Sequence, residues 1–171
     1  MRFMVFDVES VGLHGEGFAV GWVVVDGDGN EYSGDSICCP LEAAQGPDEG
    51  RAWVTEHVLP HLGPAFLETP QRVRDTFWWH WMHERALGAV LVADCPWPVE
   101  ARFLAACIED DPVNRTEYGP YPLIDVASVR LAKGLDPLGT DVRFSRELPA
   151  HNPEADARQS ARLLIEALGR N

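Results

Sequence analysis

The chain has 171 residues and a mass of 19.0 kDa, which is the size of one globular domain, so we expect residues 1–171 to form a single domain. Apolar residues make up 46% of the chain and charged residues 24%, a balance that supports a buried core and argues against a disordered chain. The net charge of −13 argues against non-specific binding to DNA or to a membrane surface, because proteins that do so are basic.

Three strands are predicted near the N-terminus. A fully apolar run at 3–6 leads into Asp-Val-Glu and is typical of a buried central strand. A second strand is predicted over 18–26 and a third over 31–39, and the sequence Asp-Gly-Asp-Gly-Asn between them indicates a hairpin turn. This turn half-matches a calcium-binding loop, but it lacks that loop's central glycine and final acidic residue, so we favour the hairpin.

Helices and short strands alternate over the rest of the chain. The helices are predicted at 51–62 with an interruption at Pro60, at 76–87, at 98–108, from a cap at Asp125 to residue 133, and from Pro153 onward with Asn152 as its cap. The strands are predicted at 89–93 and 123–124, and the stretch 135–149 is predicted to be irregular. This order predicts an α/β fold, with a mixed five-stranded sheet that is antiparallel over its first three strands, then parallel, and flanked by helices.

The cysteines and the N-terminus indicate a cytoplasmic protein. Cys38, Cys39, Cys95 and Cys107 have neither zinc-site nor disulfide spacing, so we expect reduced thiols. Only four apolar residues follow Arg2 before the first acid, which is too few for a signal peptide. No apolar run approaches the ~18 residues of a membrane helix, so we expect no membrane partner.

Negative charge is concentrated in the first three quarters of the chain. Residues 1–129 carry a net charge of −14, and residues 130–171 carry +1. A polyanion would therefore meet less repulsion at the C-terminal part. Alternatively, metal ions neutralise part of the acidic set.

Acidic side chains stand at the ends of two predicted strands. Asp7 and Glu9 are two residues apart, so on a strand both point to the same face. Two adjacent carboxylates repel each other, and a hard divalent ion such as Mg²⁺ or Mn²⁺ relieves that repulsion. Asp94 ends a strand expected to lie parallel to the first, so it is expected at the same edge. The alternative interpretation is an ordinary strand that ends in a polar turn.

Further candidates lie at the starts of two helices. Glu100 is in the first turn of its helix, where the helix dipole favours an acid with or without a function. His151 precedes the last helix, and Asp156 lies in its second turn. Asp156 is a candidate metal ligand and His151 a candidate general base, because an imidazole titrates near neutral pH.

Together these pieces resemble the DEDDh class of 3′-to-5′ exonucleases of the ribonuclease H-like superfamily. The resemblance rests on FDVESVGL at 6–13, VADCPWPVEARFL at 92–104 and HNPEADA at 151–157, in the order found in that class. LIDVASV at 123–129 looks like the strand-Asp-helix step between the second and third motifs. TFWWHWMHERA at 76–86 is similar to a Trp-rich helix of a small branch found in bacteria and phages.

The resemblance implies an activity and a set of ligands. It implies two Mg²⁺ or Mn²⁺ ions bound by Asp7, Glu9, Asp156 and one second-motif acid, with His151 accepting the proton of the attacking water. The second-motif register falls on Glu100, because Phe-Leu follows it at the usual distance, whereas Asp94 has the simpler strand-end geometry. Both stay open as the fourth ligand.

The expected substrate is a single-stranded RNA or DNA 3′ end, with RNA favoured, and the product is a nucleoside 5′-monophosphate. Trp79 and Trp97 are candidates for stacking on bases, Leu13 for a wedge beside the terminal base, and Arg158 for a phosphate contact. The alternative interpretation of each of these residues is a purely structural one, as part of the core or of a solvent-exposed surface. A homodimer is also expected from the resemblance. The competing interpretations are a non-catalytic nucleic-acid-binding or partner-binding domain, and a metal-dependent phosphatase or nucleotide hydrolase.

Overall fold

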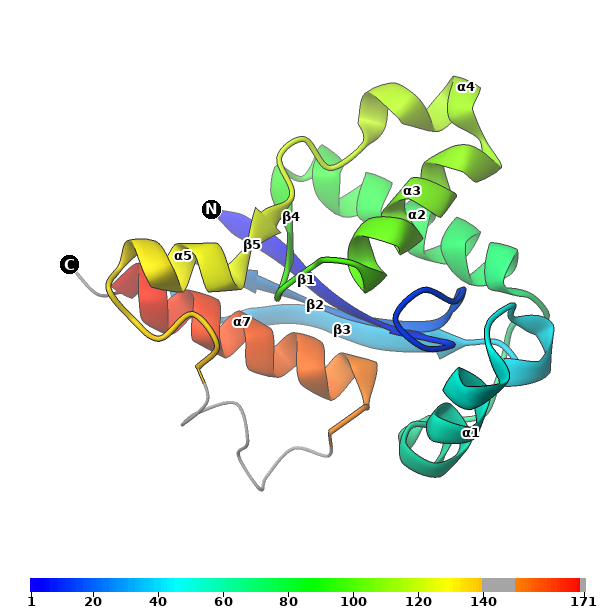
Figure 1. Ribbon diagram of the computed structural model, residues 1–171. Helices are drawn as coiled ribbons and strands as arrows, with labels where there is room; N and C mark the ends of the chain where they lie inside the picture. Colours follow the sequence, from blue (N-terminus) through cyan, green and yellow to red (C-terminus); the bar gives the residue numbers. More distant parts are fainter. Residues whose placement is uncertain (140–149, 170–171) are drawn as a thin grey trace.

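Residues 1–139 and 150–169 are described by the computed structural model, which has a central sheet with helices on both faces (Figure 1). The strands are β1 (Arg2–Ser10), β2 (Gly17–Asp26), β3 (Glu31–Cys38), β4 (Ala89–Ala93) and β5 (Ile124–Asp125). Their order in the sheet is β3-β2-β1-β4-β5. β1, β2 and β3 are antiparallel neighbours, whereas β4 lies parallel to β1 and β5 lies parallel to β4. The predicted mixed sheet is confirmed.

The helices connect and cover these strands. They are α1 (Asp48–His57), α2 (Pro70–Ala86), α3 (Val99–Asp110), α4 (Pro112–Arg115), α5 (Val126–Ala132) and α7 (Pro153–Gly169), with the 3₁₀ turns η1 (Leu41–Ala43), η2 (Leu59–His61) and η3 (Thr116–Tyr118). Within the described ranges, none of these helices has the length and apolar character needed to cross a membrane.

The alternation of side chains along β1 separates two cores. Even-numbered residues face α2 and α3, where the ring of Phe6 lies 5.1 Å from that of Phe77. Odd-numbered residues such as Val5 pack against α5 and α7 on the other face. Because successive strand residues point to opposite faces, Asp7 and Glu9 lie on the α7 face. The sheet therefore presents its candidate acids to the last helix.

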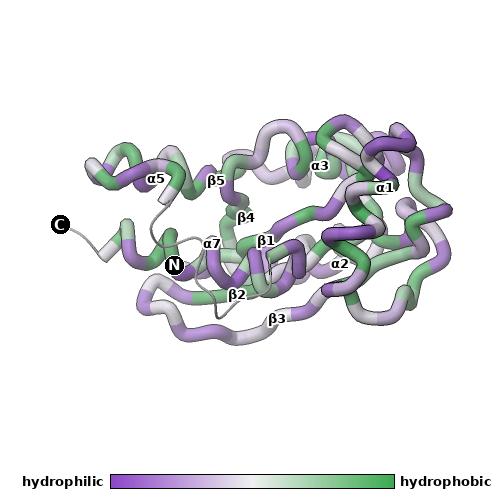
Figure 2. Tube along the Cα trace, turned by 60° about the horizontal axis from the view of Figure 1, so that its bottom comes forward, coloured by the Kyte–Doolittle hydropathy of each residue, from purple (hydrophilic) through white to green (hydrophobic). Residues whose placement is uncertain are grey.

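The outer strand β3 is hydrophilic along most of its length (Figure 2), and its residues from Glu31 to Asp35 are exposed. The turn before it is closed by Asp26, whose carboxylate accepts hydrogen bonds from the backbone of Asp28 and Asn30. These bonds and that of the Asn30 side chain lower the pKa of Asp26 to about 2. The hairpin is confirmed, and Asp26 is occupied in holding its turn.

Two predicted elements are longer than expected. The first strand was predicted at 3–6 but runs to Ser10, because β2 continues to pair with it beyond the point where β4 ends. The second helix was predicted at 76–87, but it begins at Pro70. Thr69 caps it by accepting a hydrogen bond from the backbone of Arg72, with Pro70 at the first helical position.

Smaller differences concern the chain between these elements. The helix predicted at 51–62 begins at Asp48 and ends at His57, because two acids in its first turn favour the earlier start. The segment 112–122, predicted as a loop, contains α4 and η3. Of the irregular stretch 135–149, residues 140–149 lie outside the described residues.

Both predicted helix caps are confirmed. Asp125 accepts hydrogen bonds from the backbone of Ala127 and Ser128 at the start of α5. Asn152 accepts one from Ala155 at the start of α7. The second cap is the one that matters for the site, since it fixes where α7 begins.

Candidate active site

Gly21 allows the start of α7 to lie directly on the sheet beside Asp7. The two residues are partners across β2 and β1. A Cβ atom at Gly21 would lie 2.2 Å from the backbone nitrogen of Glu154 and 2.3 Å from the carbonyl carbon of Pro153. Only glycine leaves room for this approach, and the approach brings Asp156 over the strand.

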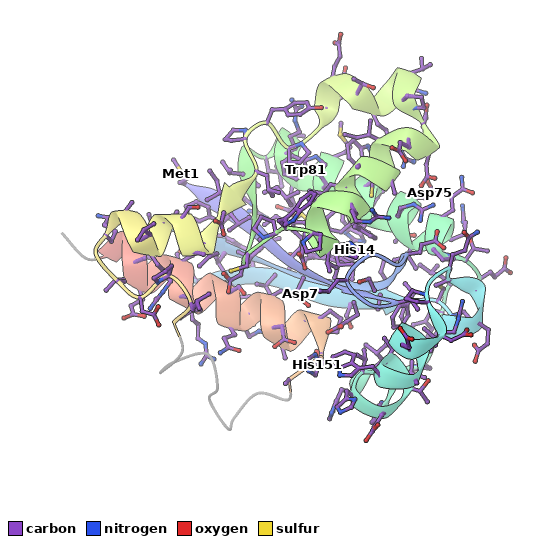
Figure 3. All side chains as sticks on the ribbon, in the orientation of Figure 1. Met1, Asp7, His14, Asp75, Trp81 and His151 are labelled. Carbon is purple, nitrogen blue, oxygen red and sulfur yellow. The ribbon has the colours of Figure 1, made fainter. Side chains whose placement is uncertain are left out.

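Three carboxylates from the two ends of the chain converge here. One oxygen atom each of Asp7, Glu9 and Asp156 can be chosen so that all lie within 4.8 Å of one another. Glu9 is buried, and the other two are partly buried. Figure 3 shows Asp7 in the middle of the sheet and His151 just before α7. The structure thus brings together four of the residues that the sequence singled out.

The carboxylates of this cluster have raised pKa values, because they are buried close to one another. Burial raises the pKa of Asp7 well above its ordinary value. Neighbouring carboxylates raise it further, in decreasing order Glu100, Glu9, Asp156 and Asp94. The pKa of Glu9 rises to about 8, through burial and then through Asp156 and Glu100. Burial raises the pKa of Asp156 to about 6, against the effect of hydrogen bonds from the backbone just before α7. Protons or cations are therefore held tightly at this site.

Glu100 reaches the cluster from the first turn of α3. β4 pairs with β1 only as far as Val5, which leaves the next part of that edge of β1 without a strand. Glu100 lies there, buried, and its Oε1 atom accepts a hydrogen bond of 3.4 Å from the backbone nitrogen of Val8. Burial raises its pKa to about 7, with Asp94 contributing.

Asp94 lies at the end of β4, at the border of the cluster. Among the acids that raise the pKa of Asp7 it has the smallest effect. Its carboxylate also belongs to a second group, in which ligand atoms of Asp94, Cys95 and Asp125 lie within 4.8 Å of one another. In that group Asp125 accepts hydrogen bonds from Cys95 and from the start of α5, so it is engaged in structure.

His151 lies at the rim of the cluster in an uncommon backbone conformation, with φ at +64°. Its Nδ1 atom is 3.8 Å from Oε1 of Glu9, and its ring meets that of Trp53 edge to face at 4.9 Å between centroids. Burial lowers the pKa of His151, and the nearby charges of His57 and His61 lower it further. A neutral imidazole is therefore favoured at neutral pH.

A cavity of about 680 Å³ opens over the cluster. Its lining includes Asp7, Glu9, Asp94, His151, Asp156, Gly12, Leu13, Trp53, Ser160 and Leu163. Its volume is in the range of sites that hold small organic ligands. Leu13 is 65% exposed at its rim, as expected for a residue free to meet a ligand.

Among the cavity residues that sequence reasoning missed, Trp53 has the largest side chain. It lies on α1, where Val54 is the buried residue and most others are polar. Its side chain is 43% exposed, and its ring stacks on His57 at 4.9 Å with 13° between planes. A large aromatic residue on a polar helix was the available signal.

Two of the predicted substrate contacts lie away from this cavity. Trp79 is on α2, which covers the face of the sheet opposite to the acids. The guanidinium of Arg158 forms ion pairs of 2.9 Å with Glu31 and 2.6 Å with Glu154, and so joins α7 to β3. Two carboxylates thus engage Arg158, and its role as a phosphate contact stays a prediction.

Trp97 lies close to the cavity but does not line it. It is 79% exposed in the loop between β4 and α3, and its neighbours Asp94 and Val99 line the cavity although Trp97 itself does not. A Trp so exposed has no packing role in the described part of the chain.

The chain is similar to known proteins in its fold. No protein-family model and no curated protein matches the sequence. Solved structures do match, among them that of S. pombe Pop2p in its Mg²⁺- and Mn²⁺-bound form, with a TM-score of 0.64. The match covers 96% of this chain and 81% of the Pop2p chain, at 14% identity.

This is a ribonuclease H-like fold. The predicted fold class is thereby confirmed. Within this ribonuclease H-like sheet, the candidate acids occupy the middle strand β1 and the two elements that close on it, α3 and α7.

Proposed function

We propose that the chain is a divalent-metal-dependent 3′-to-5′ exonuclease that releases nucleoside 5′-monophosphates from single-stranded ends, with RNA favoured over DNA. The observation that carries the proposal is the convergence of Asp7, Glu9 and Asp156 beneath an open cavity with His151 at its rim. The same four residues stand in the motifs that resemble the DEDDh exonucleases, so sequence and geometry support one function.

The residues present fit a pair of hard divalent cations. The donor set consists of carboxylate oxygens, which suit Mg²⁺ and Mn²⁺, and their mutual repulsion raises their pKa values in the absence of a cation. We propose Asp7, Glu9, Asp156 and Glu100 as the ligands, with Asp94 beside them. When bound, the ions supply Lewis-acid polarisation of the scissile phosphate and lower the pKa of the attacking water. The Pop2p structure holds these same two metals.

His151 provides a proton acceptor at the right place. Its Nδ1 atom faces Glu9 at 3.8 Å, so a water bound over the acids would lie within reach of the ring. Because the pKa of His151 is lowered, the imidazole is neutral at pH 7 and can take the proton that the water loses on attack. The backbone conformation of His151 directs the ring toward the cavity at a cost of roughly 1–3 kcal/mol, a strain that is found at functional sites.

The rim of the cavity suits a nucleobase. Leu13 on one loop and Trp53 on α1 both line it and both expose apolar surface. We propose that the terminal base lies between them, since stacking on an aromatic ring does not depend on sequence. A bound pair of divalent ions would add four positive charges to the site, so an acidic protein could bind a polyanion here.

The experiment is digestion of a 5′-labelled single-stranded oligonucleotide with Mg²⁺ or Mn²⁺. A descending ladder and nucleoside 5′-monophosphates are expected, and EDTA abolishes both. A 3′-phosphate on the same oligonucleotide slows the reaction if the enzyme starts at the 3′ end. Asp7→Asn lowers the rate by about a thousandfold, equivalent to the several kcal/mol that a metal ion contributes to the transition state. Asp35→Asn, at an exposed carboxylate on β3, is the matched control and leaves the rate unchanged.

Other outcomes identify the competing functions. Tight binding of the oligonucleotide without turnover at any metal concentration indicates a non-catalytic nucleic-acid-binding domain. Hydrolysis of mononucleotides or p-nitrophenyl phosphate in preference to the oligonucleotide indicates a phosphatase or nucleotide hydrolase. Activity that persists in EDTA contradicts the proposal outright.

A further inference from the structure

The loop that carries Leu13 has its first residue, Val11, buried in the core, and a buried arginine joins its last residue to α2. This loop, residues 11–16 and hereafter the Leu13 loop, joins β1 to β2 and forms one rim of the cavity. Leu13 itself is largely exposed, so packing of its own side chain does not fix its position. The position of Leu13 therefore depends on how the loop backbone is anchored.

The anchor at the end of the loop is Glu16. Its backbone nitrogen donates to the carbonyl of Gln45 at 2.7 Å, and its Oε2 atom accepts from the Gln45 nitrogen at 3.0 Å. Its Oε1 atom pairs with Nη1 of Arg74 on α2 at 2.9 Å. Glu16 is thus the residue through which the loop is joined to both α2 and the segment before α1.

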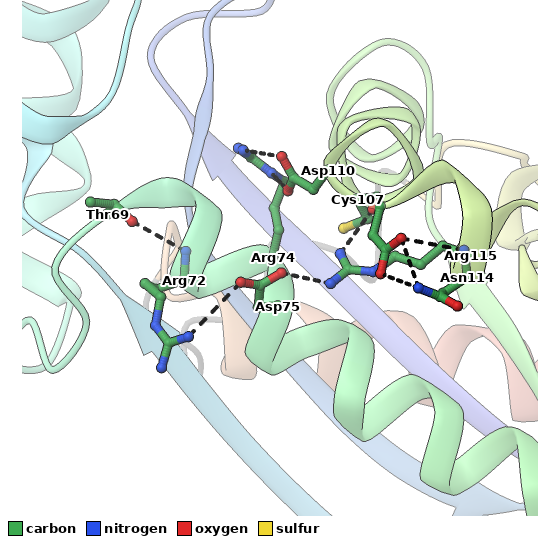
Figure 4. A network of polar contacts seen from close by, with 9 residues as sticks. Thr69, Arg72, Arg74, Asp75, Cys107, Asp110, Asn114 and Arg115 are labelled. Atoms are coloured by element: carbon green, nitrogen blue, oxygen red, sulfur yellow. Dashed lines mark hydrogen bonds and ion pairs between the residues drawn. The ribbon is translucent and has the colours of Figure 1, made fainter.

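Arg74 is held in place from its other side. Its Nε and Nη2 atoms form a forked pair with Asp110, the last residue of α3, at 2.5 Å and 3.0 Å (Figure 4). Its side chain is only 9% exposed. A buried guanidinium that is forked onto one carboxylate and bonded to a second has a fixed geometry, because its N–H donors lie in one plane at fixed directions. The loop is therefore fastened to the two helices that cover the opposite face of the sheet.

The Leu13 loop has space to move if this fastening is released. A second cavity of about 600 Å³ lies on its other side, lined by His14, Glu16, Arg74 and Asp110 among others. The cavity over the acids and this second cavity both border the loop. Displacement of the loop toward the second cavity would withdraw Leu13 from the first.

We infer that Arg74, acting through Glu16, is a positioning residue for substrate: it holds the Leu13 loop in place at the rim of the cavity that Leu13 shares with Trp53. The inference rests on the proposed function. Arg74 does not line the cavity over Asp7, Glu9 and Asp156, so its removal is expected to weaken nucleotide binding and to leave the chemistry of those acids intact.

The test uses the variant Glu16→Gln, which keeps the shape of the side chain and removes its charge. Its kinetic constants are compared with those of the wild type on two substrates. For the oligonucleotide, KM rises about tenfold, because the loop is no longer held in its binding geometry. For bis(p-nitrophenyl) phosphate, a phosphodiester without a base, kcat stays within about twofold. Arg74→Met, if the variant folds, is expected to give the same result: a higher KM for the oligonucleotide and an almost unchanged kcat for bis(p-nitrophenyl) phosphate. Hydrogen exchange at the amides of Val11 and Gly15, which bond within the loop, becomes faster.

A matched control is available on the same helix. Asp75 pairs with Arg115 at 2.6 Å, an ion pair of the same kind that does not touch the loop (Figure 4). Asp75→Asn is expected to lower Tm by an amount comparable to Glu16→Gln, with no change in KM or in exchange of the loop amides. A double-mutant cycle completes the test, since Glu16→Gln has no further effect on KM in a Leu13→Ala background.

The outcomes separate the two claims. If the wild type cleaves neither substrate, the proposed function fails, and the exchange of the loop amides in Glu16→Gln still decides whether Arg74 fixes the loop. If the wild type is active and Glu16→Gln raises KM equally with or without Leu13, or slows both substrates equally, the positioning role is overturned.

Discussion

The Nδ1 atom of His151 lies 3.8 Å from the Oε1 atom of Glu9, across the mouth of the acid cavity. Glu9 belongs to the first strand and His151 to the last connection of the described chain, so the contact exists only in the folded protein. His151 is 41% exposed at its side chain, while Glu9 is buried. A solvent-accessible imidazole beside a buried carboxylate is an arrangement that fits the proposed role of His151 as a general base.

His151→Ala is expected to lower kcat by about 10²- to 10⁴-fold, the usual contribution of a general base. Because the pKa of His151 is lowered, the part of the acidic limb that His151 contributes at saturating Mg²⁺ lies below pH 6.5, and the variant lacks that part. Mg²⁺ should raise the Tm of this variant as it does that of the wild type, since the carboxylates remain. A pH profile of the variant with the same acidic limb as the wild type would contradict the assignment.

Glu100→Gln is expected to reduce activity more than Asp94→Asn. Glu100 has the largest effect of any neighbouring carboxylate on the pKa of Asp7, and Asp94 has the smallest of the four. We expect about a hundredfold loss for Glu100→Gln and about tenfold for Asp94→Asn, in keeping with removal of a ligand and of a residue beside it. Rates at saturating Mn²⁺ measure both. The reverse order would make Asp94 the second-motif ligand.

The sequence was sufficient to predict which elements carry the acids, because that signal is local. Asp7 and Glu9 follow an apolar run at strand spacing, and Asp156 follows a helix cap at Asn152, so each could be assigned to an element and a face. Their convergence needs one further condition, the absence of a side chain at Gly21, which nothing in the sequence around Gly21 reveals. The contact appears only when α7 lies on β2.

The aromatic residues that line the cavity were less predictable, because their position depends on which side of the sheet a helix covers. Trp79 and Trp53 both lie on helices, and composition favoured the Trp-rich one. The fold puts that helix on the face opposite to the acids and puts Trp53 at the cavity. Arg158 likewise lies near Asp156 in sequence, yet its position opposite Glu31 on β3 decides its partners.

Trp53→Ala is expected to raise KM for the oligonucleotide by about tenfold, within the 1–3 kcal/mol that stacking of a base contributes. Trp79→Ala is a matched control, because Trp79 is also exposed but lies on the other face. Trp97→Ala tests the loop beside Asp94, and its effect should be smaller than that of Trp53→Ala. Equal KM values for all three variants would remove Trp53 from the binding site.

Gly21→Ala is expected to lower both stability and activity, because the added methyl group displaces the backbone at the start of α7. Overpacking of this kind costs about 1–3 kcal/mol. A shift of Asp156 by about 1 Å lowers kcat by about a hundredfold. Gly27→Ala is the control, since a Cβ atom there meets nothing within 4 Å. Full activity of Gly21→Ala would show that α7 does not need this close approach.

The metal-free protein is expected to lose stability as pH rises from about 5 to 8. In the unfolded chain Asp and Glu ionise near pH 4, whereas burial and mutual repulsion raise the pKa to about 6 for Asp156, about 7 for Glu100 and about 8 for Glu9. Over this window the folded state binds more protons than the unfolded state, so the free energy of unfolding falls as pH rises.

Mg²⁺ should reverse this loss by replacing the protons, so the gap in Tm between metal-bound and metal-free protein widens as pH rises from 5 to 8. The measurement is thermal unfolding with excess EDTA and with excess Mg²⁺ across that range. Asp7→Asn removes a charge from the centre of the cluster, which flattens the pH dependence without metal and narrows the gap. If the difference in Tm between metal-bound and metal-free protein stays constant with pH, the carboxylates with raised pKa values and the metal do not share one site.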